Sequence, residues 1–184
     1  GSVGNYGNLG VADILCGSVN PSGGLFDIFT SQNMSAPAMQ NMGEIFYANK
    51  EVVTRTGGVM SFKPGAYTIE AEGIYVGYRY FDAANKQVQF PFGHGLSYTT
   101  FEYSDLTLSS DAINENDGLT VTLKVKNTGD RAGAEVVQLY VQDVESTIFR
   151  PVKELKGFKK VFLEAGEETT VTFTLDSRSF AYYN

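Results

Sequence analysis

The sequence lacks several residue types on which many protein functions depend. Among its 184 residues there is no tryptophan, and there is only one cysteine and one histidine. The single cysteine, Cys16, excludes an intramolecular disulfide and a multi-cysteine metal cluster. The single histidine, His94, has no second histidine or nearby cysteine with which to complete a metal site. We therefore expect no metal and no cofactor.

Basic residues and long apolar runs are also scarce. The chain has 14 Lys and Arg against 21 Asp and Glu, a formal net charge of -7. We expect no nucleic-acid partner, because phosphate binding needs a basic surface. No run approaches about 18 apolar residues, and no basic segment with an apolar stretch opens the chain, so we expect neither a membrane helix nor a secretory signal. The length also excludes a (β/α)8 barrel, which needs about 250 residues.

The second half of the chain has the pattern of an antiparallel β-sandwich. Hydrophobic residues make up 42% of the sequence and aromatic residues 13%, which is enough for a core. Apolar residues alternate with Thr, Lys or Gln in several short runs separated by turn signals, which predicts strands with one buried face. These runs are residues 101–108, 119–126, 137–143, 161–163 and 170–175. Residues 164–167 have Gly166 at the tip of a predicted hairpin-like turn.

The first half is less regular. Residues 11–15 predict a helical turn or two, with Cys16 as a small buried side chain. Met39, Met42 and Phe46 have the spacing of a short helix whose Met stripe packs in a core. Residues 54–65, with Gly and Pro pairs, predict a loop. The run at residues 74–81 predicts a strand buried on both faces, because it is rich in β-branched and aromatic side chains.

Seven short segments carry a further signal, and they cover most of the chain. In order they read ADILCG and NPSGGL (residues 12–17 and 20–25), EGIYVGYRYFD (72–82), FPFGHGLSYTTF (90–101), KNTG and GAEVVQLYV (126–129 and 133–141), and RPVKELKGF (150–158). Together they resemble the C-terminal portion of a bacterial glycoside hydrolase of family 3, the β-glucosidase family. The sequence departs from the family pattern at Phe26-Asp27-Ile28-Phe29, where the family has Pro followed by apolar residues.

The resemblance implies a domain organisation. Residues 1–100 would be the C-terminal remnant of an α/β sandwich domain, with an irregular insert at about 31–71. Residues 101–184 would be a fibronectin type III-like, immunoglobulin-like antiparallel β-sandwich. In this family the nucleophilic Asp lies in a barrel, and the acid/base Glu lies before the ADILCG segment. We therefore expect no catalytic, cofactor-binding or metal-binding residue in this chain.

A few residues can still be weighed as chemical candidates. Glu72 lies beside aromatic residues, but we expect it to pair with Arg79 or the backbone; Glu70 and Asp82 are the other predicted partners of Arg79. His94 could be a ligand or a proton shuttle, but we expect its side chain to pack at the inter-domain corner and to hydrogen-bond the backbone. Gly93 and Gly95 on either side would permit a tight bend there. Two further sets remain: the tyrosines that could stack on a sugar, for which packing is the competing interpretation, and a basic run that predicts a solvated edge strand. The tyrosines are Tyr140, Tyr182 and Tyr183, and the basic run is Lys153, Lys156, Lys159 and Lys160.

Three functions follow as hypotheses. The first is an accessory part of a β-glucosidase-like hydrolase that braces catalytic domains; the parent reaction would hydrolyse terminal β-D-glycosidic bonds. The second is an immunoglobulin-like carbohydrate-binding or cell-surface module. The third is one piece of a split or clipped glycosidase that is active only with its partner fragment.

The resemblance also implies partners and a location. The expected partners are the absent catalytic domains and a carbohydrate, and residues 1–71 could mediate self-association. The expected location is the bacterial cytoplasm or the secreted space.

Overall fold

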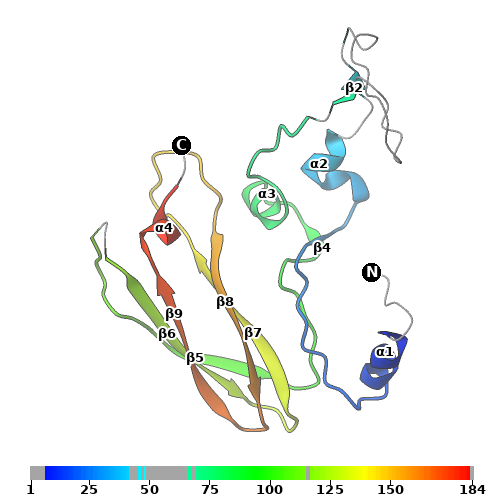
Figure 1. Ribbon diagram of the computed structural model, residues 1–184, viewed down its shortest axis with the longest axis vertical. Coiled ribbons are helices and arrows are strands. Elements are labelled where there is room, and N and C mark those ends of the chain that lie inside the picture. Colours follow the sequence, from blue (N-terminus) through cyan, green and yellow to red (C-terminus); the bar gives the residue numbers. More distant parts are fainter. Residues whose placement is uncertain are drawn as a thin grey trace, which may run out of the picture. The chain divides into compact units, whose positions relative to one another are not determined.

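The chain forms two compact units. The computed structural model describes residues 7–41, 45–46, 48, 66–67, 69–114 and 117–182 (Figure 1). One unit consists of Gly1–Phe26 and Gly93–Asn184, and the other of Asp27–Phe92. This grouping adds residues 1–26 to the sandwich. The domain boundary expected at residue 100 concerns the family's domains and stays a prediction.

The first unit is built around a sandwich of five long strands, drawn from green to red in Figure 1. The strands are β5 (Phe101–Leu108), β6 (Leu119–Asn127), β7 (Gly133–Val141), β8 (Glu154–Leu163) and β9 (Glu168–Leu175). One antiparallel sheet has the order β5-β6-β9, and the other pairs β7 with β8. The predicted antiparallel sandwich is confirmed, and each predicted run lies in one of these strands except the end of 137–143, since β7 stops at Val141.

The core lies between the two sheets. Alternate residues of β6 and β9 face inward, as the period of two requires. Val125 and Val171 have no exposed surface. The buried apolar residues form one cluster: Val121, Leu123, Val125, Val137, Val161, Leu163, Val171, Phe173 and Leu175.

The turn at residues 164–167 does not make the predicted hairpin. The strands on either side of it, β8 and β9, belong to different sheets, so the turn carries the chain across the sandwich. Glu164 N donates to Glu167 Oε2 at 2.7 Å, and Gly166 has a φ of 78°. The alternation in β9 needs only one buried face, and either sheet can provide that, so the local pattern could not identify the pairing partner.

The N-terminal part of the same unit contains α1 (Gly7–Leu15), which confirms the predicted helical turns. Cys16 follows it and is exposed, so the expectation of a buried thiol is wrong. The physical reason is that α1 has no buried residue among those described; Leu15, for example, is 78% exposed. The apolar run at residues 11–15 is therefore not part of a buried core.

The second unit contains short elements. Its two-residue and three-residue strands pair as β1 (Phe29–Thr30) with β4 (Val88–Phe90) and β2 (Ile45–Phe46) with β3 (Ala66–Tyr67). Its helical turns are η1 (Asn33–Ser35), α2 (Pro37–Gln40) and α3 (Tyr78–Ala83).

Two sequence predictions in this unit are wrong. The strand expected at residues 74–81 is instead a turn followed by α3, with only Phe81 buried in the helix. Gly77, at φ 54°, begins the helix, and the β-branched residues Ile74 and Val76 lie before it and are partly exposed. The β-propensity of this run is therefore overridden by its surroundings.

The helix expected through Met39 and Phe46 also differs. α2 ends at Gln40, and Phe46 lies in β2. Met42 and the predicted loop at residues 54–65 lie outside the described residues. No helix in the described part of the chain is long and apolar enough to cross a membrane.

Candidate functional site: a polar anchor on the sandwich

Asn20 joins three separate parts of the first unit. Its Oδ1 accepts hydrogen bonds from Ser97 Oγ at 3.0 Å and from Tyr98 N at 2.8 Å. Its Nδ2 donates to the carbonyl oxygen of Ala132 at 2.9 Å. One amide side chain thus joins the segment after α1 to residues 97–98, which precede β5, and to the loop before β7. Asn suits this position because it both accepts and donates.

Other side chains fasten the same segment nearby. Lys160 Nζ on β8 donates to Ser22 Oγ at 2.9 Å. Arg131 Nη2 donates to the carbonyl oxygen of Gly17, and the Arg131 guanidinium lies 5.5 Å from the ring centroid of Tyr98. The two hydrogen bonds link residues 138 and 114 positions apart, so they fix the segment to the sandwich.

Backbone contacts continue the attachment. Leu25 N donates to the carbonyl oxygen of His94 at 2.8 Å, and Gly93 N donates to the carbonyl oxygen of Leu25 at 2.7 Å. Gly24 forms a β-bridge with Gly95, and a Cβ on Gly95 would lie 2.6 Å from the carbonyl oxygen of Gly23. Glycine at 95 is therefore required by close backbone approach. The hydrogen bond to His94 is made by its main-chain carbonyl oxygen, so the bonding expected of its side chain stays a prediction.

Asn127, at the end of β6, binds the segments beside this attachment. It is fully buried, and its Oδ1 accepts from Thr99 Oγ1 at 2.6 Å and from Gly129 N at 3.1 Å. Its Nδ2 donates to the carbonyl oxygens of Arg131 at 2.7 Å and Leu163 at 3.1 Å. A buried amide is stable only when its donors and acceptors are all engaged, as they are here.

We call Asn20, Ser22, Thr99, Asn127, Arg131 and Lys160 the polar anchor. Sequence analysis identified the stretches around Asn20 and Asn127 only as segments that carry the family resemblance and assigned no role to either side chain. The available signal was an Asn two or three residues before a Gly in both segments, NPSGG and KNTG, since Asn can bond neighbouring backbone groups. The long-range partners could not be read from local sequence.

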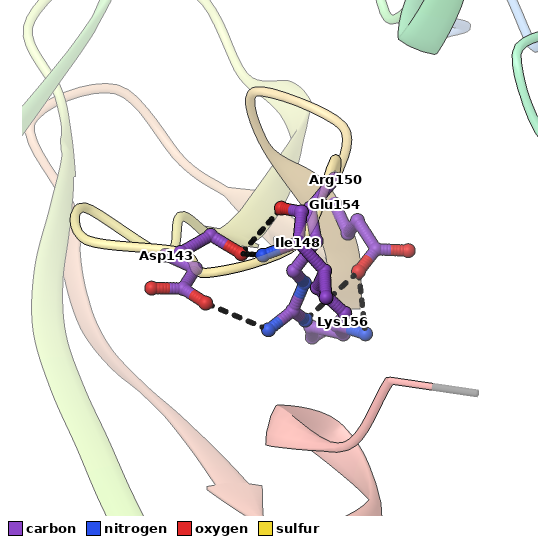
Figure 2. A network of polar contacts seen from close by, with 6 residues as sticks. Asp143, Ile148, Arg150, Glu154 and Lys156 are labelled. Atoms are coloured by element: carbon purple, nitrogen blue, oxygen red, sulfur yellow. Dashed lines mark hydrogen bonds and ion pairs between the residues drawn. The ribbon is translucent and has the colours of Figure 1, made fainter. Parts of the chain in front are cut away.

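A second polar network lies around the loop that connects β7 with β8. Figure 2 shows Arg150 between Asp143 and Glu154. Arg150 Nη1 lies 2.9 Å from Asp143 Oδ2, and Arg150 Nη2 lies 3.6 Å from Glu154 Oε2, which also contacts Lys156 Nζ at 3.4 Å. Both carboxylates bind one guanidinium, so they fix the loop between the strands. The network borders a hollow of about 730 Å³ that Phe180 also lines.

A tyrosine and a glutamate interact across the sandwich. Tyr103 Oη on β5 donates to Glu135 Oε1 on β7 at 2.7 Å. Partial burial, followed by the hydrogen bond and the negative charge of Glu135, raises the pKa of the Tyr103 phenol well above its usual range. The phenol therefore keeps its proton and donates throughout the physiological pH range.

The acidic candidate from sequence, Glu72, has a side-chain partner other than the predicted Arg79. Glu72 Oε2 accepts from Asn41 Nδ2 at 2.9 Å, so its structural partner is an amide. The Arg79 guanidinium lies 6.0 Å from the ring centroid of Tyr78. Among the described residues, no three His, Cys, Asp or Glu side chains gather as a metal site would require.

The tyrosines proposed for sugar stacking have other contacts. Tyr140 Oη donates to Gln138 Oε1 at 2.6 Å, and Lys153 Nζ lies 5.4 Å from the Tyr140 ring centroid. Arg150 lies 5.1 Å from the ring centroid of Tyr182, and Tyr183 lies outside the described residues. A cation already covers each described ring, which disfavours a flat sugar platform.

The basic run on β8 is only partly a solvated face. Lys159 is exposed on this edge strand, as predicted. Lys153, just before β8, and Lys160 are exposed as well, although Lys160 also contacts Ser22; only Lys156 is partly buried, and it contacts Glu154. The strand thus combines a charged edge with attachment of the N-terminal segment.

Comparisons with known proteins agree with this arrangement. Residues 135–184 match the fibronectin type III-like domain family. Thermostable beta-glucosidase B of Acetivibrio thermocellus is 49% identical over 174 residues, which are 95% of this chain and 20% of that protein. The periplasmic beta-glucosidase of Salmonella typhimurium is 40% identical over 98% of this chain and 21% of its own length.

Solved structures give the same result. The GH3 beta-glucosidase of Bifidobacterium adolescentis has a TM-score of 0.78 and 36% identity, covering 97% of this chain and 23% of that one. Beta-glucosidase 3B of Thermotoga neapolitana in complex with glucose also has a TM-score of 0.78, with 37% identity and coverage of 97% and 22%. The chain thus spans about a fifth of the length of the relatives that it matches.

Proposed function

Because this chain resembles the C-terminal portion of family 3 β-glucosidases over nearly its whole length, we propose that it is the accessory part of such an enzyme and braces the catalytic domains. The parent reaction is the hydrolysis of terminal β-D-glycosidic bonds. The observation that carries the proposal is the polar anchor, which fixes the segment containing α1 to a sandwich that is otherwise remote in sequence.

The exposed side of that segment supports a bracing role. Leu9 and Leu15 on α1, and Phe26 after it, are mostly exposed. Large apolar side chains on a folded surface are typical of protein interfaces when they occur together. The sandwich holds this segment by its polar atoms and leaves apolar side chains available to catalytic domains.

The experiment compares Asn20→Ala with Ser18→Ala in the longer enzyme. Asn20→Ala removes three hydrogen bonds of the anchor, whereas the side chain of Ser18 is exposed in the same segment. The activity is followed as hydrolysis of an aryl β-glucoside during incubation at elevated temperature. We expect Asn20→Ala to shorten the half-life of this activity severalfold, with KM unchanged, and Ser18→Ala to have no effect. Equal half-lives for the two variants would contradict bracing.

A second assay addresses the alternatives. The 184-residue chain alone should not hydrolyse an aryl β-glucoside and should not bind oligosaccharides saturably. Hydrolysis that disappears on changing one of its acidic residues would make the chain itself catalytic. Saturable oligosaccharide binding would favour the carbohydrate-binding module instead.

A further inference from the structure

The loop between β5 and β6 contains the only Asp-Gly pair of the sequence, Asp117-Gly118. Every other Asp is followed by a residue that has a side chain, and no Asn is followed by Gly. The residue after an Asp decides how closely its backbone nitrogen approaches the Asp carboxyl carbon, and Gly has no Cβ to prevent that approach. Asp117 and Gly118 are both exposed, so water reaches the pair.

An exposed Asp-Gly pair is open to an isomerisation in which water is the only other reactant. The backbone nitrogen of Gly118 bonds to Cγ of the protonated Asp117 carboxyl. The proton of that nitrogen and the hydroxyl of the carboxyl leave together as water, and a cyclic imide (succinimide) remains. Water then opens the ring: addition at Cγ restores Asp, whereas addition at the main-chain carbonyl carbon gives isoaspartate. In isoaspartate the main chain runs through Cβ and Cγ.

The structure holds the Asp117 carboxyl against Asn114. Asp117 Oδ2 accepts hydrogen bonds from Asn114 N at 2.9 Å and from Asn114 Nδ2 at 2.8 Å. Asp117 N donates in return to the carbonyl oxygen of Asn114 at 3.0 Å. These bonds join Asp117 to a residue that precedes it, whereas the attacking nitrogen belongs to the residue that follows it. The attack therefore requires this arrangement to open.

The same contacts make the carboxyl less reactive. The backbone N–H of Asn114, and then its side-chain amide, hold the pKa of the Asp117 carboxyl below its usual value, because both donate to the ionised form. An ionised carboxylate has no hydroxyl to lose as water, so only the protonated form closes the ring. Asn114 thus opposes the reaction both by geometry and by charge.

We propose that Asp117 is the residue of this chain that converts to isoaspartate, and that Asn114 slows the conversion by holding the Asp117 carboxyl in the folded state. The structural consequence is local. The longer main chain displaces Gly118 relative to Leu119, which begins β6 and pairs with Leu175 of β9. Isoaspartate at 117 therefore loosens the start of β6 and leaves the rest of the sandwich paired.

The first experiment locates the modification. The 184-residue chain is incubated for weeks at mildly acidic pH, and its tryptic peptide of residues 87–124 is analysed by chromatography and fragment-ion mass spectrometry. We expect isoaspartate to accumulate at Asp117 and not at Asp111, which lies in the same loop but precedes Ala112. Gly118→Ala should slow the accumulation severalfold, because the added Cβ hinders the attack. Accumulation mainly at any other residue would overturn the assignment.

The second experiment tests the role of Asn114. Asn114→Ala removes the side-chain donor, so we expect isoaspartate at Asp117 to form severalfold faster in the folded chain. Thr107→Ala, also exposed but without a contact to Asp117, is the matched control and should leave the rate unchanged. In concentrated urea the contact is lost, so Asn114→Ala should then have no effect. Equal rates for the folded Asn114→Ala variant and the unchanged chain, or an equal acceleration in urea, would show that Asn114 does not act through this contact.

The third experiment measures the structural consequence by amide hydrogen exchange of the aged chain. We expect the amides of Leu119 and Thr120 to exchange faster in the isoaspartate fraction than in the Asp fraction, and the amide of Val125 to exchange equally in both. Identical exchange at Leu119 in the two fractions would contradict the loosening of β6.

Discussion

At the scale of single residues, the strongest structural requirement falls on a polar side chain in the core. Asn127 is fully buried among valines and leucines, and it engages a hydroxyl, a backbone N–H and two carbonyl oxygens. No apolar side chain can replace these four contacts. The residue fixes the start of β7, the end of β8 and the segment before β5 in one arrangement.

We expect Asn127→Ala to lower the free energy of unfolding by about 3 kcal/mol, because it leaves Thr99 and the Leu163 carbonyl oxygen buried without their partner. Asn127→Asp should be at least as destabilising, because it keeps the volume but replaces a donor with a buried charge. Urea denaturation of the chain measures both. Lys126→Ala, at the exposed neighbouring position, should stay within about 0.5 kcal/mol of the unchanged chain. A mild effect of Asn127→Asp would show that volume matters there and hydrogen bonding does not.

At the scale of elements, the attachment of residues 17–26 depends on two glycine-rich segments that approach each other closely. A Cβ on Gly95 would meet the backbone oxygen of Gly23 at 2.6 Å, and backbone cannot move aside as a flexible side chain can. A Cβ on Gly23 itself would meet nothing within 4 Å, and its φ lies outside the left-handed region.

The two glycines therefore form a matched pair for one test. We expect Gly95→Ala to lower the free energy of unfolding by about 1–3 kcal/mol through overpacking. Gly23→Ala should be neutral or should stabilise by about 0.5 kcal/mol, because it reduces the freedom of the unfolded chain. Thermal unfolding by circular dichroism measures the difference. Equal shifts for the two variants would mean that the bridge between Gly24 and Gly95 is not maintained in solution.

The elements also show what could be predicted from sequence. The alternation in residues 119–126 and 170–175 is set by a single buried face, so the strands and the sandwich class were predictable. The pairing of β9 with β6 was not, because it depends on residues about 50 positions away. The run at 74–81 was misassigned because Ile74 and Val76 favour a strand, while Gly77 and the packing of Phe81 produce a helix.

The same distinction holds for the candidate site. The bend around His94 was predictable, since Gly on both sides is a local signal and Gly93 has a φ of 81°. The polar anchor was not predictable, because every side-chain bond between Asn20, Arg131 or Lys160 and its partner crosses more than 70 residues of sequence. Local patterns carry no information about such partners.

At the scale of the whole molecule, the first unit is interrupted by the second. Residues 27–92 leave the first unit after Phe26 and return at Gly93. The two points of exit and return are adjacent, because Leu25 and Gly93 are joined by a backbone hydrogen bond of 2.7 Å and Leu25 also bonds to His94. The second unit is thus inserted at a closed pair of antiparallel segments.

This geometry predicts that the second unit can be removed without unfolding the first. We expect a variant in which residues 27–92 are replaced by Asn-Gly to fold, because a two-residue turn of this type closes antiparallel segments. Its sandwich should unfold within about 3 °C of the complete chain, and amide exchange of β6 and β9 should be unchanged. The comparison variant, residues 93–184 alone, also lacks Asn20 and Ser22 and should unfold at a temperature lower by at least about 5 °C. If the excised variant is as unstable as residues 93–184 alone, then the segment at 7–26 is not held by the polar anchor, and the second unit must itself contribute to the stability of the sandwich.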